Sequence, residues 1–203
     1  MSSSPATDPR RVSVIVPVKR LGAAKSRTQL PSAAREELAL ELMARTVGAA
    51  LAATSVARVI VVAGDAAVAE AARTLGATVL TEPGSGGLNG AIAAGRDHAV
   101  QSFPDDDVAV VVGDLADLDS ADLDAVVAEF HRTGTPLLVP DHLGTGTTML
   151  VHALAESPSL LFGVDSAARH QAAGYTSFVA APSSARRDVD SPADVELFSS
   201  AVR

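Results

Sequence analysis

The sequence predicts an α/β protein with a mostly parallel, Rossmann-like sheet and helices on both faces. Nearly continuous apolar runs at 12–18, 58–63 and 107–112 are typical of strands buried on both sides. Segments with helix start and stop signals lie between these runs, and strands that alternate with helices form parallel sheets with right-handed crossovers. With 47% hydrophobic residues, a chain of 203 residues can bury the large core that such a sheet needs.

Capping residues place the helices along the chain. Polar side chains that suit a helix N-cap precede three of the predicted helices, and Gly76 is expected to end the second. These caps and helices are Ser32 with a helix to about residue 53, Asp65 with a helix through Leu75, and Ser120 with a helix over 121–132. Shorter signals predict further helices at 88–100, 166–173 and from Ser191 onward, and further strands at 77–80, 136–139, 148–151 and 175–180.

A single domain is expected over residues 11–203, preceded by a polar, disordered tail over 1–10. The tail lacks the apolar segment of a signal peptide. No apolar run in the chain reaches the ~20 residues of a membrane helix. The cytoplasm is therefore the expected location.

Charge and cysteine content exclude several classes of protein. The chain has 24 acidic and 16 basic residues, and its net charge of −8 argues against broad binding to nucleic acids or anionic membranes. Because there is no cysteine, disulfides, thiolate nucleophiles and zinc ribbons are excluded. Small molecules are the expected partners, and the composition does not indicate an oligomeric state.

The loop at 17–27 is the first candidate binding site, because ligands of such sheets bind beyond the carboxyl ends of the strands. It holds four cations, which include the only two lysines of the chain. Cationic side chains and backbone N–H groups together bind polyphosphates. A solvated basic turn is the alternative, and neither a Walker loop nor a GxGxxG motif is present. The residues expected to contact a nucleotide here are Pro17, Val18, Lys19, Lys25 and Arg27.

Carboxylates occur at two other places where a ligand is expected. Asp114 follows the predicted strand 107–112, where a hard cation could bridge it to phosphate oxygens. Asp188 and Asp190 precede the last predicted helix, and either could supply a second carboxylate to the same metal. From spacing alone, helix caps and turns explain these aspartates equally well.

Three further segments, 84–90, 144–148 and 162–166, are rich in small or hydroxyl-bearing residues. In the first, Gly86 and Asn89 are candidates for nucleotide contacts, because an amide can hydrogen-bond a base or a ribose. In the last, the helix that begins at Ser166 could hold a small acidic substrate. Ordinary turns and caps explain the same residues. The five histidines show no ligand spacing, although His170 follows Ser166 by one helical turn.

Taken in order, five motifs resemble those of the guanylyltransferases of deazaflavin coenzyme F-420 biosynthesis, a family of the molybdopterin- and sugar-nucleotidyltransferase type. The motifs cover nearly the whole chain, and the third and fourth are the more specific to this family. They are PVKRLGAAKSR (17–27), GDLADL (113–118), GTGTTML (144–150), FGVDSAARH (162–170) and DVDSPADV (188–195).

The resemblance implies a fold similar to glycosyltransferase A and a reaction in which GMP passes from GTP to a phosphorylated three-carbon acid, with release of pyrophosphate. The acid would be phosphoenolpyruvate, giving enolpyruvyl-diphospho-guanosine, or 2-phospho-L-lactate; the arginine-rich composition favours the first by association. The resemblance also implies roles for individual residues. Lys25 and Asp114 would be catalytic, Asp114 with Asp190 or Asp188 would hold magnesium, and Thr148, Gly163 and Ser166 would contact the acid.

Two alternatives stay open. Another nucleotidyltransferase of the same type could use CTP or a sugar phosphate. A GTP-binding regulatory module is the non-enzymatic alternative, but Asp114, Asp190 and Lys25 argue against it, because a pure binder does not need two metal carboxylates.

Overall fold

The computed structural model describes residues 10–156 and 158–201. Residues 1–9 of the predicted tail lie outside this part of the chain. Arg10, the last residue of that tail, donates hydrogen bonds to the carbonyl oxygens of Asp105 and Pro104, at 2.9 and 3.1 Å. In the described part of the chain, no helix combines the length and the apolar character that crossing a membrane requires.

Seven strands form one sheet within the described residues, in the order β3-β2-β1-β4-β6-β5-β7. All neighbouring strands are parallel except β6, which is antiparallel to both β4 and β5. The mostly parallel sheet that the sequence predicts is therefore confirmed. The strands are β1 (Val12–Val18), β2 (Val56–Ala63), β3 (Thr78–Thr81), β4 (Asp107–Val111), β5 (Leu137–Pro140), β6 (Thr147–His152) and β7 (Thr176–Ser177).

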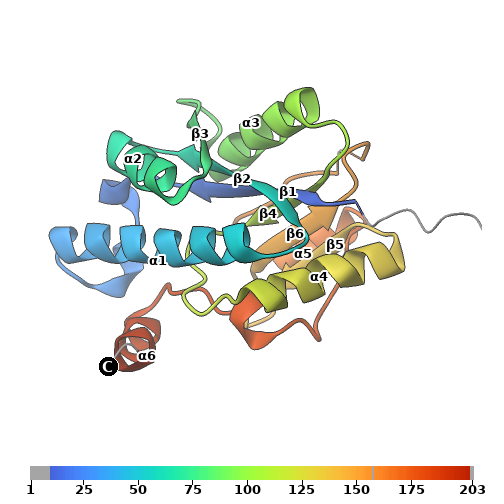
Figure 1. The fold of residues 1–203 in the computed structure, drawn as a ribbon. Coiled ribbons are helices and arrows are strands. Elements are labelled where there is room, and N and C mark those ends of the chain that lie inside the picture. The colour runs from blue at the N-terminus through green and yellow to red at the C-terminus, as the bar shows by residue number, and fades with distance from the viewer. Residues whose placement is uncertain (1–9, 157, 202–203) are drawn as a thin grey trace, which may run out of the picture.

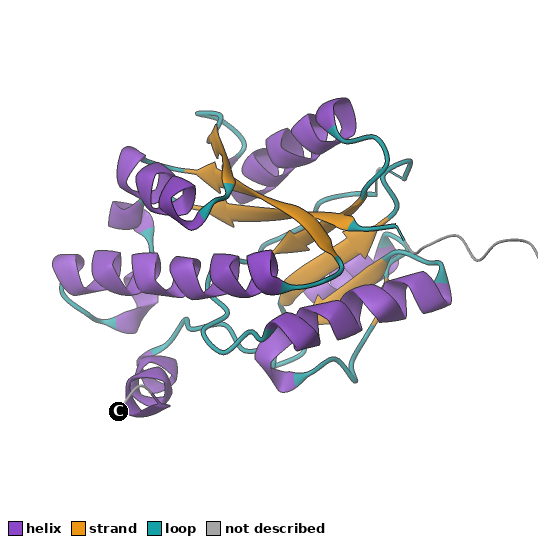
Figure 2. Ribbon diagram, in the orientation of Figure 1, coloured by secondary structure: helices purple, strands orange, loops and turns teal. Residues whose placement is uncertain are grey.

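Helices cover both faces of the sheet (Figure 1 and Figure 2). One face carries α1, α2 and α4, the other α3 and α5, and α6 packs through Phe198 beside Leu38 and Leu42 of α1. Short 3₁₀ turns η1 (Leu21–Ala23), η2 (Ser26–Thr28) and η3 (Ser183–Ala185) occupy loops. The α-helices are α1 (Ser32–Ala52), α2 (Ala66–Leu75), α3 (Gly87–Ser102), α4 (Ser120–Thr133), α5 (Ser166–Ala172) and α6 (Pro192–Ala201).

The central strand β1 shows why the apolar runs have no polar alternation. Val14 and Val16 pack into the core under α1, whereas Ile15 between them packs into the core under α3, and all three are fully buried. A strand that is covered on both faces must be apolar on both faces. The same argument holds for β4 from Val108 to Val111, whereas its first residue, the buried Asp107, pairs with Arg10 and His131.

Several predicted helix ends are confirmed and others shift by one residue. The carboxylate of Asp65 accepts the N–H of Val68 at 3.1 Å, and Gly76 ends α2 with a φ of 96°. Ser32 is not a cap, because it is already the first residue of α1 and follows Pro31. Ser120 is not a cap either, since the carboxylate of Asp119 accepts the N–H of Ala121 at 2.7 Å and starts α4 one residue earlier.

The strand predicted over 175–180 is the least accurate prediction of the fold. Only Thr176 and Ser177 pair with β5. After the N–H of Phe178 has donated to Leu138, the N–H of Ala181 donates back to Phe178 at 3.2 Å. The chain therefore turns away from the sheet, and the rest of the apolar run leaves the ladder.

The sheet order determines where a ligand can bind. The strand β1 pairs with β2 on one side and with β4 on the other. The chain runs from β1 toward β2 and from β4 toward β5, so the connections that leave β1 and β4 run in opposite directions along the sheet. The loops after β1 and β4 therefore separate at the carboxyl ends of these strands. In sheets of this kind, a crevice opens at such a point.

Two glycines in helices offer a test of how α3 packs on the sheet. A Cβ on Gly95 of α3 would lie 2.6 Å from Cγ2 of Ile15, whereas a Cβ on Gly48 of α1 would meet no atom within 4 Å. We expect Gly95→Ala to lower the free energy of unfolding by about 1–3 kcal/mol through overpacking. Gly48→Ala should instead raise it by up to about 1 kcal/mol. Urea denaturation of both variants checks this, and equal effects would contradict the packing described here.

Candidate active site

A cavity of about 600 Å³ lies at the carboxyl ends of β1 and β4. It brings together the three groups of residues that the sequence singled out separately: the basic loop, the aspartates, and the hydroxyl-bearing segments. The lining residues include Pro17, Val18, Lys19, Lys25, Arg27, Leu88, Gly113, Asp114, Asp141, Thr145, Thr147, Phe162, Gly163, Asp165, Ser166, Asp188 and Asp190.

The start of the basic loop is held against β2 by backbone contacts. The N–H of Gly64 donates to the carbonyl of Val18 at 2.8 Å, and the N–H of Leu21 donates to Asp65 at 2.9 Å. A Cβ on Gly64 would lie 2.4 Å from the backbone nitrogen of Arg20, so only glycine allows the two chains to approach so closely. The loop thus enters the cavity from a fixed direction.

Lys25 is the cation at the centre of the cavity wall. Its ammonium contacts the carboxylate of Asp114, the carbonyl of Val189 at 2.6 Å and the carboxylate of Asp190 at 3.5 Å. Only 7% of its side chain is exposed. Although burial lowers the pKa of Lys25, the neighbouring carboxylates, above all Asp114, raise it by more, so the net pKa lies above the usual value. Lys25 is therefore a buried, positively charged group.

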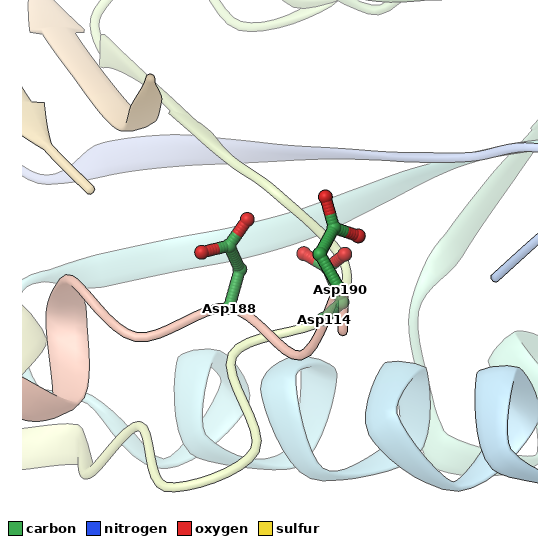
Figure 3. Close-up of side chains that lie close together, drawn as sticks. All are labelled: Asp114, Asp188 and Asp190. Atoms are coloured by element: carbon green, nitrogen blue, oxygen red, sulfur yellow. The ribbon is translucent and has the colours of Figure 1, made fainter. Parts of the chain in front are cut away.

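Three carboxylates crowd together in this cavity, and Figure 3 shows how they lie. One oxygen each of Asp114, Asp188 and Asp190 lies within 4.8 Å of the others. Burial, together with the charges of Asp114 and Asp190, raises the pKa of Asp188 to about 6. Oxygen ligands at this spacing, with a net negative charge, suit a hard divalent cation. The sequence left Asp188 and Asp190 as alternatives, and the structure brings both to Asp114.

The other basic residues of the loop differ in their contacts. Arg27 lines the cavity with 83% of its side chain exposed, and its guanidinium lies 3.8 Å from Asp190. Lys19 also lines the cavity and is exposed. Arg20 is exposed and is not a lining residue. Lys25 is thus the buried cation of the loop, and Lys19 and Arg27 are accessible to a ligand.

The segments 141–147 and 162–166 supply a further part of the cavity lining. The carboxylate of Asp141 accepts the N–H groups of Thr145 and Gly146, each at 2.9 Å, and so closes the loop before β6. Gly163 has a φ of 134°, and the buried Ser166 donates its N–H to the Gly163 carbonyl at 3.2 Å. Gly163 and Ser166 both line the cavity. Their contact with the acid stays a prediction.

The side chain of Thr148 does not line the cavity. Successive residues of a strand face opposite sides of the sheet, and here Thr147 lines the cavity. The hydroxyl of Thr148 is buried and donates to the carbonyls of Val139 and Ala185, at 3.2 and 2.7 Å. The side chain of Thr148 thus ties β6 to η3, and a contact of Thr148 with the acid, like those of Gly163 and Ser166, stays a prediction.

Arg186 links the same region through main-chain oxygens. Its guanidinium donates to the carbonyls of Pro140, Asp141 and Val179, at distances of 3.1, 3.0 and 2.9 Å. Because Arg186 lies just before Asp188 in the chain, it fastens the segment that bears the last two aspartates to the end of β5.

The glycine-rich segment lies at the edge of the cavity. Leu88 is a lining residue, whereas Gly86 and Asn89 are not. The amide of Asn89 accepts the N–H of Phe162 at 2.9 Å and donates to its carbonyl at 3.1 Å. Asn89 therefore positions Phe162, and its contact with a nucleotide, like that of Gly86, stays a prediction.

The sequence motifs did not single out Asp141, Thr147 or Asp165 as site residues. Asp141 directly follows β5, and a carboxylate after a strand end was the signal that identified Asp114. Thr147 could have been chosen over Thr148 only by knowing where β6 begins, because a shift of one residue reverses the two faces.

Comparison with known proteins places this site in a family. The model of the MobA-like NTP transferase domain matches residues 19–186. A phosphoenolpyruvate guanylyltransferase of Streptomyces coelicolor is 39% identical over 188 residues, which cover 90% of this chain and 87% of that protein. One from Salinispora arenicola is 40% identical over 90% of this chain and 85% of its own length.

The chain belongs to the phosphoenolpyruvate guanylyltransferase family. A relative of this name in Mycobacterium marinum is 37% identical over 91% of this chain and 86% of its own length. Four of the five motifs that carry the resemblance lie at least in part within the region matched by the MobA-like domain, and only the segment from Asp188 lies beyond it.

Solved structures of other proteins have a similar fold. The structure of 4-diphosphocytidyl-2C-methyl-D-erythritol synthase superposes with a TM-score of 0.61, at 9% identity, over 96% of this chain and 100% of the other. CMP:2-keto-3-deoxy-manno-octonic acid synthetase, solved with CTP, gives a TM-score of 0.60 at 11% identity, over 95% and 98% of the two chains. The fold is therefore that of nucleotidyltransferases similar to glycosyltransferase A.

The raised pKa of Asp188 leads to a prediction about the stability of the protein without a bound metal. A carboxyl whose folded pKa of about 6 exceeds its unfolded value loses stabilisation as the pH rises through that range. Asp188→Asn, studied with a chelator, should therefore raise the free energy of unfolding at pH 7 by about 1–2 kcal/mol. The gain should shrink toward zero near pH 4.

The matched control for this prediction is Asp97→Asn on the exposed face of α3, which should change stability by less than about 0.5 kcal/mol. Denaturant titrations at both pH values measure the two variants. A loss of stability on Asp188→Asn at pH 7 would show that the three carboxylates do not repel one another in the folded protein.

Proposed function

We propose that the protein transfers the GMP moiety of GTP to the phosphate of phosphoenolpyruvate and releases pyrophosphate, giving enolpyruvyl-diphospho-guanosine. One observation carries this proposal: relatives 37–40% identical over at least 85% of their own lengths are named phosphoenolpyruvate guanylyltransferases. The cavity supports it, because it holds buried and exposed cations on one wall and small polar residues on the other. We further propose that this product serves deazaflavin coenzyme F-420 biosynthesis.

The reaction needs no general base. A phosphate monoester has a second pKa of about 6 and is largely a dianion at neutral pH. An oxygen of this phosphate attacks the α-phosphorus of GTP, and the bond from that phosphorus to the bridging oxygen breaks. Pyrophosphate leaves with the bonding electrons. The main obstacle is the repulsion between two polyanions, so the catalytic task is positioning and charge neutralisation.

The basic loop provides the protein's own positive charge for this step. Lys25 is buried and charged, and we propose that its ammonium contacts the α- or β-phosphate when GTP is bound. Lys19 and Arg27 line the cavity from more exposed positions and would contact the remaining phosphates. Backbone groups at Pro17 and Val18 would lie against the nucleoside.

The three carboxylates fit a magnesium ion in their chemistry and their spacing. Asp114, Asp188 and Asp190 would hold it, and the bound ion would neutralise phosphate charge. In its absence, Lys25 balances part of the carboxylate charge. The same ammonium would serve both the aspartates and the triphosphate, because it lies on the cavity wall between them.

The substrate assignment is tested by pairing each of four nucleoside triphosphates with phosphoenolpyruvate or 2-phospho-L-lactate and measuring pyrophosphate release. We expect the fastest release from GTP with phosphoenolpyruvate, and its loss on removal of magnesium by a chelator. Faster turnover of 2-phospho-L-lactate would make that acid the assigned substrate. A preference for CTP would indicate another kind of nucleotidyltransferase. Binding of GTP without turnover would support the regulatory module.

Lys25→Ala should lower kcat for guanylyl transfer by about 10²–10³-fold, by analogy with the loss of one preorganised charge-stabilising group. The matched control is Arg20→Ala, which removes an exposed cation of the same loop that does not line the cavity. Steady-state kinetics and thermal unfolding of both variants are the measurements. Near-wild-type turnover of a folded Lys25→Ala variant would refute the assignment.

A further inference from the structure

His170 is a fully buried histidine that the reaction described above does not use. It lies on α5, where its ring packs edge-on against Phe162 and Tyr175, with centroids 5.0 and 5.4 Å away. Both ring nitrogens have partners. Nδ1 lies 3.0 Å from the hydroxyl oxygen of Thr147, and Nε2 accepts the backbone N–H of Leu161 at 2.9 Å. The ring therefore connects the start of β6 with the segment that precedes Phe162.

The contact with Leu161 determines where the ring carries its proton. A backbone N–H can only donate, so Nε2 must present a lone pair. Because burial and the charge of Arg169 lower the pKa of His170 to about 4, the ring is neutral at pH 7. A neutral imidazole without a proton on Nε2 carries it on Nδ1. The Nδ1–H group therefore faces the hydroxyl oxygen of Thr147, which can only accept from it. A hydrogen bond with the backbone of Ser166 also acts on the ring and partly offsets the lowering of its pKa.

This direction of donation also determines what Thr147 can do. Its oxygen accepts from His170, so its own proton is left to donate elsewhere. The described residues provide no other hydrogen bond for this hydroxyl, which lies on a cavity wall and belongs to a residue that is only 7% exposed. A buried donor without a partner is costly, and an anionic oxygen is the strongest partner for it.

We propose that His170 is a positioning residue that holds the hydroxyl of Thr147 as a hydrogen-bond donor for an anionic oxygen of the phosphorylated acid. This inference rests on the proposed function for the identity of the acid. The other tautomer would place two N–H groups against each other at Leu161, so His170 restricts Thr147 to a single role. The pair thus selects an anion at this wall, alongside Gly163 and Ser166.

The tautomer can be tested without any assay of activity. In ¹⁵N-labelled wild-type protein at pH 7, long-range ¹H–¹⁵N spectra distinguish protonated from unprotonated ring nitrogens. The His170 signals are assigned by comparison with a His170→Asn variant. We expect a neutral ring with its proton on Nδ1. A proton on Nε2 would overturn the proposal, whatever substrate the protein uses.

Kinetics test the consequence for the acid. Thr147→Val removes the hydroxyl while keeping the shape, and His170→Phe removes both ring nitrogens while keeping an aromatic ring. Each should raise KM for phosphoenolpyruvate by about 10- to 100-fold, the effect of losing one hydrogen bond to a charged group. KM for GTP should change less than threefold, by about 0.6 kcal/mol. Equal increases for both substrates would refute the proposal.

A double variant separates positioning from a general structural role. If His170 acts through Thr147, then Thr147→Val combined with His170→Phe should be no worse than Thr147→Val alone. If the double variant raised KM by the product of the two single fold-changes, the result would contradict this coupling. His170→Asn, whose amide nitrogen can replace Nδ1–H, should raise KM less than His170→Phe. If His170→Phe does not fold, Thr147→Val and the tautomer measurement still test the proposal. If the wild-type protein turns over neither acid, the proposed function is refuted instead.

Discussion

The contact of one ammonium group with two of three crowded carboxylates is the interaction on which the site depends: Lys25 contacts Asp114 and Asp190, and the charge of Asp188 also acts on it. Asp114 follows β4 in the middle of the chain and Asp188 lies near its C-terminal end, and burial together with the charges of Asp114 and Asp190 raises the pKa of Asp188. Lys25 lies among them with its side chain almost fully buried, and its pKa is raised in turn. Each group is tolerable in the interior only because the other is present. This arrangement concentrates positive and negative charge at one place in the cavity.

The sheet supports this arrangement because the middle of its central strands is apolar on both faces. The charged residues of the site lie in loops beyond the carboxyl ends of these strands. These loops are held by backbone partners: Gly64 against Val18, Asp65 against Leu21, and Asn89 against Phe162. A rigid scaffold with fixed loop origins can keep like charges close without collapse.

Much of the fold follows from the sequence, because buried strands and capping residues are local signals. Asp65 and Gly76 mark both ends of α2 correctly. The antiparallel direction of β6 and the short β7 depend on long-range pairing, which no local pattern records. In the site, cations and aspartates could be identified by residue type. Which of Thr147 and Thr148 turns its side chain to the cavity depends on the strand register. The role proposed for His170 could not be predicted from the sequence, because it depends on the contacts of both ring nitrogens, with Thr147 and Leu161.

Arg186 has a consequence for how the two halves of the cavity respond to each other. Its guanidinium is bound to three main-chain oxygens of the β5 end and the segment after β7, and Thr148 adds a further tie to Ala185. A displacement of the loop that begins at Asp141 is therefore passed along the chain to Asp188 and Asp190. The loop that begins at Asp141 and the segment of Asp188 and Asp190 therefore share one tether, and a ligand that displaced one of them would displace the other.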